Sequence, residues 1–362
     1  MKETKRKQWF FLTLGGTAAA LLLIAAVMIF VDPYFHYHKP IEGITYRLFS
    51  ERYMNDGIAK HFEYNAVITG SSMNQNFKAS KMDELFGTNT IKIPFSGAGF
   101  QEIAKNIEVA MDSGNEIKYV LWGLDYNGII RDHYYKGYDD YPEYLYDNNP
   151  WNDVSYFWNK TLIFEGLVSN LILTLQGEES TSFDDYSTWD VGGGWEQIHH
   201  TYKRSEEILP MKRLNEIEEI ESRKLEDNIR INIVELAKKY PQTQFLIFYT
   251  PYSALYWESL YRDGHLVRQL EAEKLATELL LTCDNIRLYS FAKETEITGN
   301  IEYYRDKEHY VSEINDKILK WITSDQGRIT KDNYEEFLQW EYDYYMNYDY
   351  DRLYEGYEKY MN

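Results

Sequence analysis

The sequence predicts an α/β domain with a mostly parallel, five-stranded sheet in a three-layer α/β/α arrangement, preceded by one transmembrane helix. Two observations carry this prediction. From about residue 64 onward, short apolar β-rich runs alternate with helical segments. Ahead of them, residues 9–31 form an uncharged run at the N-terminus. Alternating strands and helices are typical of a parallel sheet covered by helices on both faces.

The N-terminal run is long enough to cross a membrane. At about 1.5 Å per residue, residues 9–31 can span a hydrocarbon core of about 30 Å. Four of the eight residues before it are basic, which predicts a cytoplasmic N-terminus and an extracytoplasmic remainder. A cleaved signal peptide is the alternative, but its apolar region is usually shorter, and Phe30-Val31-Asp32-Pro33-Tyr34 is a poor cleavage sequence. We therefore expect a single-pass protein of the cell membrane.

Composition excludes several classes of protein. The 362 residues include 38 Lys+Arg and 58 Asp+Glu, for a formal net charge of −20, which argues against a nucleic-acid binder. An aromatic content of 17% argues against intrinsic disorder. The single cysteine, Cys283, excludes an internal disulfide framework. The pairs His36/His38 and His199/His200 lack neighbouring ligands at a metal-binding spacing, so no metal or other cofactor is expected.

Each predicted strand is an apolar, β-rich run that ends at a turn residue. The five runs cover residues 66–69, 90–95, 118–122, 244–249 and 285–291. The predicted helices have apolar residues at helical spacing. They cover residues 100–112, 225–240, 258–281 and 311–322.

Two segments depart from this alternation. Residues 127–224 are rich in aromatic residues and predict an insertion of loops and short helices, whereas residues 325–362 predict a Tyr-rich acidic helix. The expected organisation is then a basic cytoplasmic segment, an anchor, a juxtamembrane segment, an α/β domain containing the insertion, and the C-terminal helix. Their boundaries are 1–8, 9–31, 32–63, 64–324 and 325–362.

The first motif follows the first predicted strand, which ends in Gly70-Ser71-Ser72. Ligands of open parallel sheets bind beyond the carboxyl ends of the strands. A serine at that position, opening a helical segment, can act as a nucleophile beside outward-pointing N–H groups. The same pattern also occurs as a plain turn and helix cap.

The second motif lies 237 positions further along the chain, just before the last predicted helix. Asp306 precedes His309 by three residues. At this spacing a carboxylate can orient an imidazole and stabilise its cation while the other ring nitrogen faces a hydroxyl. A solvated polar loop is the alternative. Taken together, the two motifs predict that a serine after the first strand, His309 and Asp306 act as nucleophile, base and orienting acid.

These motifs resemble those of the SGNH (GDSL-like) hydrolase superfamily. Its first block, Gly-Asp-Ser, is similar to Gly70-Ser71-Ser72, and its last block, Asp-x-x-His, is similar to Asp306-Lys307-Glu308-His309. Its second block supplies an oxyanion-hole glycine and is similar to Ser96-Gly97-Ala98-Gly99. Its third block, Gly-x-Asn-Asp, differs here, because Gly123-Leu124-Asp125-Tyr126 has Asp125 at the position of the asparagine. A carboxylate donates no hydrogen bond unless it is protonated.

The resemblance implies an ester hydrolase or O-acyltransferase that works through an acyl-serine intermediate on Ser72. Its oxyanion hole would consist of the N–H groups of Ser72 and Gly97. Further residues expected to line the pocket are Ser71, Asn74, Asp125 and Tyr252, the last of which follows the fourth strand.

The single anchor and the variant first block are also similar to outward-facing proteins of the teichoic-acid D-alanylation and alginate O-acetylation type. This likeness implies a cell-wall or exopolysaccharide polymer as substrate and a multi-pass membrane acyltransferase as partner.

Two alternatives stay open. One is a catalytically silent module that binds polymer or scaffolds an envelope export complex, and the other assigns the nucleophile to Ser71. The aromatic side chains of the insertion either form a platform for sugar rings or pack the insertion onto the sheet. They are Tyr134, Tyr135, Tyr138, Tyr141, Tyr144, Tyr146, Trp151 and Trp158.

Overall fold

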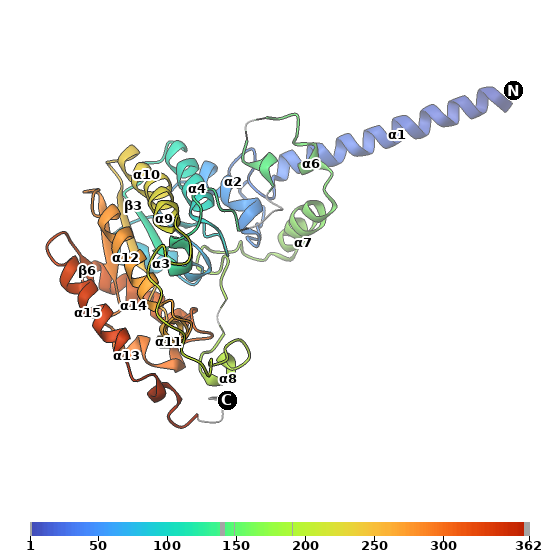
Figure 1. Cartoon of the computed structure of the whole chain (residues 1–362). Coiled ribbons are helices and arrows are strands. Elements are labelled where there is room, and N and C mark those ends of the chain that lie inside the picture. Colours follow the sequence, from blue (N-terminus) through green and yellow to red (C-terminus); the bar gives the residue numbers. More distant parts are fainter. Residues whose placement is uncertain (1, 138–141, 148, 190, 358–362) are drawn as a thin grey trace. The chain divides into compact units, whose positions relative to one another are not determined.

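The computed structural model describes residues 2–137, 142–147, 149–189 and 191–357 (Figure 1). The chain forms two compact units. Unit 1 combines residues 1–62 with residues 140–182, and unit 2 combines residues 63–139 with residues 183–362. Residues 127–224, expected as one insertion, therefore belong partly to each unit. The other predicted boundaries stay predictions.

Unit 1 is helical and begins with α1 (Lys2–Val31). From Thr4 to Val31 this helix is long and apolar enough to span a membrane, because its sequence consists mainly of Ala, Leu, Ile and Phe and has no proline. The remaining helices of unit 1 are short. They are α2 (Glu51–His61), η2 (Glu143–Leu145), α6 (Val154–Phe157), η3 (Leu162–Val168) and α7 (Ser169–Gln176).

The end of α1 is fixed by a buried carboxylate, Asp32, which is fully buried and has a φ of 45°. Its Oδ1 accepts hydrogen bonds from the His36 N–H at 2.9 Å and the Tyr156 hydroxyl at 2.6 Å. Its Oδ2 accepts from the N–H groups of Tyr37 at 2.7 Å and His38 at 2.9 Å. One side chain therefore turns the chain out of α1 and holds the following loop against α6.

Unit 2 contains a six-stranded sheet with the order β2-β1-β3-β4-β5-β6. Neighbouring strands from β2 to β5 are parallel, and β6 pairs with β5 antiparallel. The prediction of five strands was wrong by one, because β6 is only two residues long and leaves no periodicity in the sequence. The strands are β1 (Ala66–Gly70), β2 (Thr90–Lys92), β3 (Tyr119–Leu124), β4 (Gln244–Tyr249), β5 (Ile286–Ser290) and β6 (Arg328–Ile329).

Helices of unit 2 lie between and after these strands. The longer ones are α3 (Ala79–Phe86), α4 (Phe100–Asp112), α9 (Glu221–Ile229), α11 (Ala254–Arg262), α12 (Leu266–Leu280), α14 (Ser312–Thr323) and α15 (Tyr334–Met346). The shorter ones are η1 (Ser72–Asn74), α5 (Tyr126–Ile129), α8 (Trp195–Ile198), η4 (Arg230–Val234), α10 (Glu235–Lys239), α13 (Thr295–Thr298), η5 (Ile301–Tyr303) and η6 (Tyr350–Tyr354).

One predicted helix is divided in two. The single helix expected over residues 258–281 is broken between α11 and α12, where Gly264 adopts a φ of 71°. A positive φ is readily available to glycine and interrupts a right-handed helix. The apolar spacing continues across this break, which is why the periodicity predicted one helix.

The sheet order reverses between β1 and β3, because the chain passes from β1 to β2 on one side and then crosses to β3 on the other. In register, Gly70 of β1 lies opposite Gly123 of β3, and Leu124 of β3 lies opposite Tyr249 of β4. The loops that follow these strands therefore begin at one edge of the sheet. Such a reversal is where open α/β sheets bind ligands.

Replacing Asp32 should loosen unit 1. In Asp32→Ala four donors lose their acceptor, so we expect a loss of about 3 kcal/mol in the free energy of unfolding of this unit. Hydrogen exchange of the amides of His36, Tyr37 and His38, measured by mass spectrometry in detergent, reports this opening. The matched control is Asp147→Ala, which removes an exposed carboxylate from the same unit. Equal exchange in both variants would contradict the role given to Asp32.

Candidate active site

Two of the sequence motifs meet in unit 2. The Ser72 Oγ lies 2.8 Å from Nε2 of His309, and Nδ1 of the same ring lies 2.8 Å from Oδ2 of Asp306. The carboxylate accepts a hydrogen bond from Nδ1–H, which leaves Nε2 unprotonated and able to accept a hydrogen bond from the serine hydroxyl. The three side chains form a continuous relay between segments 237 residues apart.

Ser72 is held at the end of β1 by a tight turn. It opens η1, a single helical turn. Gly70 has a φ of 134°, and a Cβ there would lie 2.3 Å from Oδ1 of Asn74. A Cβ on Gly123 of the neighbouring strand would lie 2.6 Å from the same atom. Both glycines therefore leave room for Asn74 under the turn.

Asn74 is fully buried by this packing. It was expected to line the pocket, but it is not among the residues that line the two cavities around Ser72. The side chain supports the turn from below instead.

The loop that carries Asp306 and His309 is tied to the turns after β1 and β4. The Tyr304 hydroxyl donates to the carbonyl of Pro251 at 2.7 Å, and the Tyr310 hydroxyl donates to that of Met73 at 3.4 Å. The hydroxyl of Ser253 donates to the carbonyl of Lys307 at 2.7 Å. These bonds position the imidazole over the serine.

The electrostatic surroundings of His309 favour its cation. Burial by itself lowers the pKa of His309, but the hydrogen bond and charge of Asp306, with the charges of Glu308 and Asp125, outweigh it and raise the pKa above 6.5. Burial also acts to raise the pKa of Asp306, yet its bonds to the ring and backbone of His309 and to the Glu308 N–H keep that pKa below its usual value. Asp306 is therefore ionised and pairs with the base.

Two cavities meet at the serine. One, of about 250 Å³, is lined by Ser71, Asp125 and Tyr252 among others, and the second, of about 560 Å³, by Trp189 and Arg305 among others. Ser72, Gly97 and His309 line both. A group bound to Ser72 would thus have space on both sides.

Backbone donors suited to an oxyanion lie at the junction of the cavities. Gly97 follows β2 with a φ of 68°, which favours glycine. Neither its N–H nor that of Ser72 donates a hydrogen bond within the residues that the structure describes. Both groups are thus available to a ligand oxygen.

Asp125 lies beyond the end of β3, and its Oδ1 accepts a hydrogen bond from the Tyr252 hydroxyl at 2.9 Å. Burial raises the pKa of Asp125, although hydrogen bonds with Ser71 and Tyr252 and the charges of His309 and Arg131 act in the opposite direction. Ser71 is buried, and its Oγ accepts from the Met73 N–H at 3.2 Å. The geometry therefore favours Ser72, not Ser71, as the hydroxyl that His309 activates.

Several residues of the site gave no signal in the sequence. The Trp189 indole N–H donates to the Ser72 carbonyl at 3.1 Å, and its ring lies edge-on to His309 with centroids 5.1 Å apart. Arg305 lies over the Trp189 ring at 5.6 Å. The Glu308 carboxylate accepts from the Asn127 amide at 3.0 Å. These side chains converge only through the fold, so spacing along the chain does not reveal them.

The other candidates from the sequence lie elsewhere. Tyr135 lines the smaller cavity, whereas Trp151 and Trp158 belong to unit 1 and Tyr138 and Tyr141 lie outside the described residues. His38 bonds the carbonyl of Ile29 at 2.9 Å, and the rings of His199 and His200 lie 3.8 Å apart. Across the described ranges, no group of three or more His, Cys, Asp or Glu could hold a metal ion.

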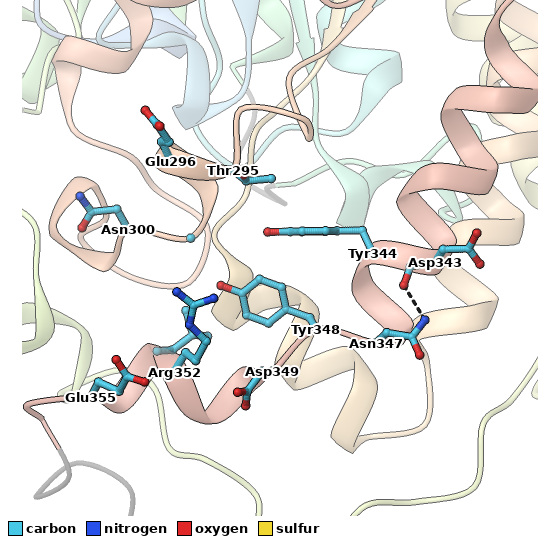
Figure 2. Close-up of a pocket in the computed structure, with 12 residues that line it drawn as sticks. Thr295, Glu296, Asn300, Asp343, Tyr344, Asn347, Tyr348, Asp349, Arg352 and Glu355 are labelled. Carbon is cyan, nitrogen blue, oxygen red and sulfur yellow. Dashed lines mark hydrogen bonds between the residues drawn. The ribbon is translucent and has the colours of Figure 1, made fainter.

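A larger cavity, of about 640 Å³, shares no lining residue with the two around Ser72. Figure 2 shows Tyr344 and Tyr348 projecting into it, with the Arg352 guanidinium beside Tyr348. The Asn347 amide donates to the carbonyl of Asp343 at its rim, at 2.8 Å. Its described lining includes no serine, cysteine or histidine, whereas the cavities at Ser72 hold the hydrogen-bonded Ser72, His309 and Asp306.

Comparison with known proteins identifies no family for the chain. No family model and no curated protein matches the sequence. Among solved structures, the chain is similar to one provisionally described as a platelet activating factor from Streptococcus pneumonia. The TM-score is 0.39 at 12% identity, over 76% of this chain and 91% of the other. A likeness this distant assigns neither a family nor an activity.

The pKa of His309 is the measurable consequence of this geometry. We expect its imidazole to titrate above pH 6.5 and the midpoint to fall in Asp306→Asn, because the variant loses the carboxylate that favours the cation while burial, which opposes it, remains. NMR of isotopically labelled histidine measures both midpoints. His200, at the edge of the larger of the two cavities, serves as internal reference. An unchanged His309 midpoint would contradict the pairing.

Proposed function

We propose that this protein is a membrane-anchored, extracytoplasmic serine esterase or O-acyltransferase of the SGNH type, acting on a cell-envelope or secreted glycopolymer. The observation that carries the proposal is the relay from Ser72 through His309 to Asp306 at the reversal of the sheet order. The proposal includes the three-layer arrangement of that superfamily and α1 as a single-pass anchor with its N-terminus in the cytoplasm.

The first half-reaction is acyl transfer to the serine. The Ser72 Oγ attacks the ester carbonyl carbon while His309 Nε2 takes its proton, and Asp306 stabilises the resulting imidazolium. The oxyanion then accepts hydrogen bonds from the backbone N–H groups of Ser72 and Gly97. Each such donor lowers the barrier by about 3–4 kcal/mol. Collapse breaks the bond to the leaving alcohol, which receives the proton from His309 and leaves an acyl-serine.

The second half-reaction returns the free enzyme. Water, or a hydroxyl of the polymer, attacks the acyl-serine while His309 takes its proton. The second tetrahedral intermediate then releases an acid or a new ester, and Ser72 recovers its proton. Space on both sides of Ser72 suits an acyl group in one cavity and an alcohol or acceptor in the other. A multi-pass membrane acyltransferase that hands over the acyl group is part of this proposal.

A fluorophosphonate probe tests the nucleophile. We expect covalent labelling of the full-length protein in detergent, abolished in Ser72→Ala, retained in Ser71→Ala, and reduced by about six orders of magnitude in rate in His309→Ala. Intact-mass spectrometry measures the adduct. Labelling that survives in Ser72→Ala would refute the assignment. A folded protein that never labels would favour the non-catalytic polymer-binding or scaffold module.

Substitutions of Asp125 test whether this side chain donates a hydrogen bond at the position where the third SGNH block has an asparagine. Its raised pKa favours the protonated carboxyl, which can donate a hydrogen bond, and an asparagine donates at any pH. We therefore expect Asp125→Asn to retain its labelling rate above neutral pH better than the parent protein does, and Asp125→Leu to be slow throughout. The rate of probe labelling against pH measures this difference. A parallel loss in both variants would contradict a donor role.

A further inference from the structure

Unit 1 exposes apolar side chains next to α1. The helices η3 and α7 form one continuous apolar helix over Leu162–Gln176, in which Glu165 is the only charged residue. Together with one tryptophan from just after α6, this helix presents a set that we term the apolar rim. The apolar rim consists of Trp158, Phe164, Leu171, Ile172 and Leu175, all exposed.

The helix is apolar on both of its sides. Leu162 and Leu167 are buried within unit 1, which accounts for one side. On a soluble protein the opposite side of such a helix is normally charged or polar. Here Leu175 is 88% exposed and Phe164 60% exposed. Contiguous exposed apolar side chains of this kind mark an interaction surface.

The apolar rim begins on the membrane-spanning part of α1. The Trp158 indole N–H donates to the carbonyl of Leu21 at 3.2 Å. Both α6 and η3 contact α1, and Figure 1 shows α6 beside α1. Leu21 precedes the last residue of α1, Val31, by ten residues, so Trp158 meets α1 about 15 Å before the helix ends.

The basic residues at the start of α1 determine how deep in the membrane the contact between Trp158 and Leu21 lies. Basic side chains up to Lys7 stay at the headgroups of one leaflet. A hydrocarbon core of about 30 Å then covers about 20 residues and ends near residue 27. Leu21, and Trp158 with it, lies about 10 Å inside that boundary. If the apolar rim lay in water, Leu22 and Leu23 of α1 would lie in water too. The rest of α1 would then be too short to span the hydrocarbon core.

We infer that the apolar rim is a membrane-docking surface, immersed among the acyl chains of the leaflet at the C-terminal end of α1. The helix of residues 162–176 would lie at the boundary between headgroups and acyl chains, as amphipathic helices of monotopic proteins do. Trp151 of the same unit is 88% exposed, and tryptophan is a side chain suited to the headgroup level. The inference rests on α1 spanning the membrane, and it does not require catalysis.

The test uses the full chain in phosphatidylcholine nanodiscs at one protein per disc. In a Cys283→Ala background, which removes the single native cysteine, Phe164→Cys, Leu171→Cys or Leu175→Cys is labelled with an environment-sensitive NBD dye. Discs contain plain lipid or lipid brominated in the upper acyl chain. We expect a loss of emission with the brominated lipid at all three positions, because an interfacial helix buries its apolar side among the acyl chains. Leu14→Cys on α1 is the positive control for insertion.

Each outcome decides the inference. Quenching at the rim and at Leu14→Cys supports it. Quenching at Leu14→Cys with none at the rim overturns it while leaving the anchor intact, and no quenching anywhere overturns both. Fluorophosphonate labelling of the same variants reports separately on the proposed function.

Discussion

The candidate site depends on the attachment of one loop to two strand ends. Tyr304 and Tyr310 are fully buried tyrosines whose hydroxyls reach the carbonyls of Pro251 and Met73. Buried polar groups are costly unless they are paired, so these bonds specify one position for the loop between them. Because His309 lies in that loop, the position of the imidazole over Ser72 follows from bonds that take no part in the chemistry.

The turn that carries Ser72, opposite the histidine loop, is equally constrained. Asn74 fills the space that the absence of a Cβ at Gly70 and Gly123 leaves beneath the turn. A larger residue at either glycine would push the turn that carries Ser72 upward. The serine is therefore fixed from below by packing and from above by the histidine loop. Rigid support from both directions is what holds a nucleophile and a base at hydrogen-bond distance before a ligand binds.

Local signals in the sequence predicted much of this arrangement. Helix 100–112 and strand 244–249 were predicted to the residue, because each has an unbroken period and clear ends. The meeting of Ser72, His309 and Asp306 was predicted from a serine motif after a strand, an Asp three residues before a His, and the family resemblance, and the structure places the three side chains within hydrogen-bond distance. Trp189 and Tyr304 were missed, since their roles arise from contacts across more than 50 residues. The grouping of residues 140–182 with the N-terminal segment is likewise a long-range property.

Three carboxyl groups near His309 differ in pKa although all are substantially buried. Burial raises the pKa of Asp125 and of Glu308, and their few hydrogen bonds do not reverse it. Asp306 accepts from the ring of His309 and from two backbone N–H groups, and these bonds outweigh burial. Surroundings that shift the pKa values of similar groups in opposite directions also give those groups different roles. Asp306 therefore stays ionised beside His309, whereas burial shifts Asp125 and Glu308 toward their neutral forms.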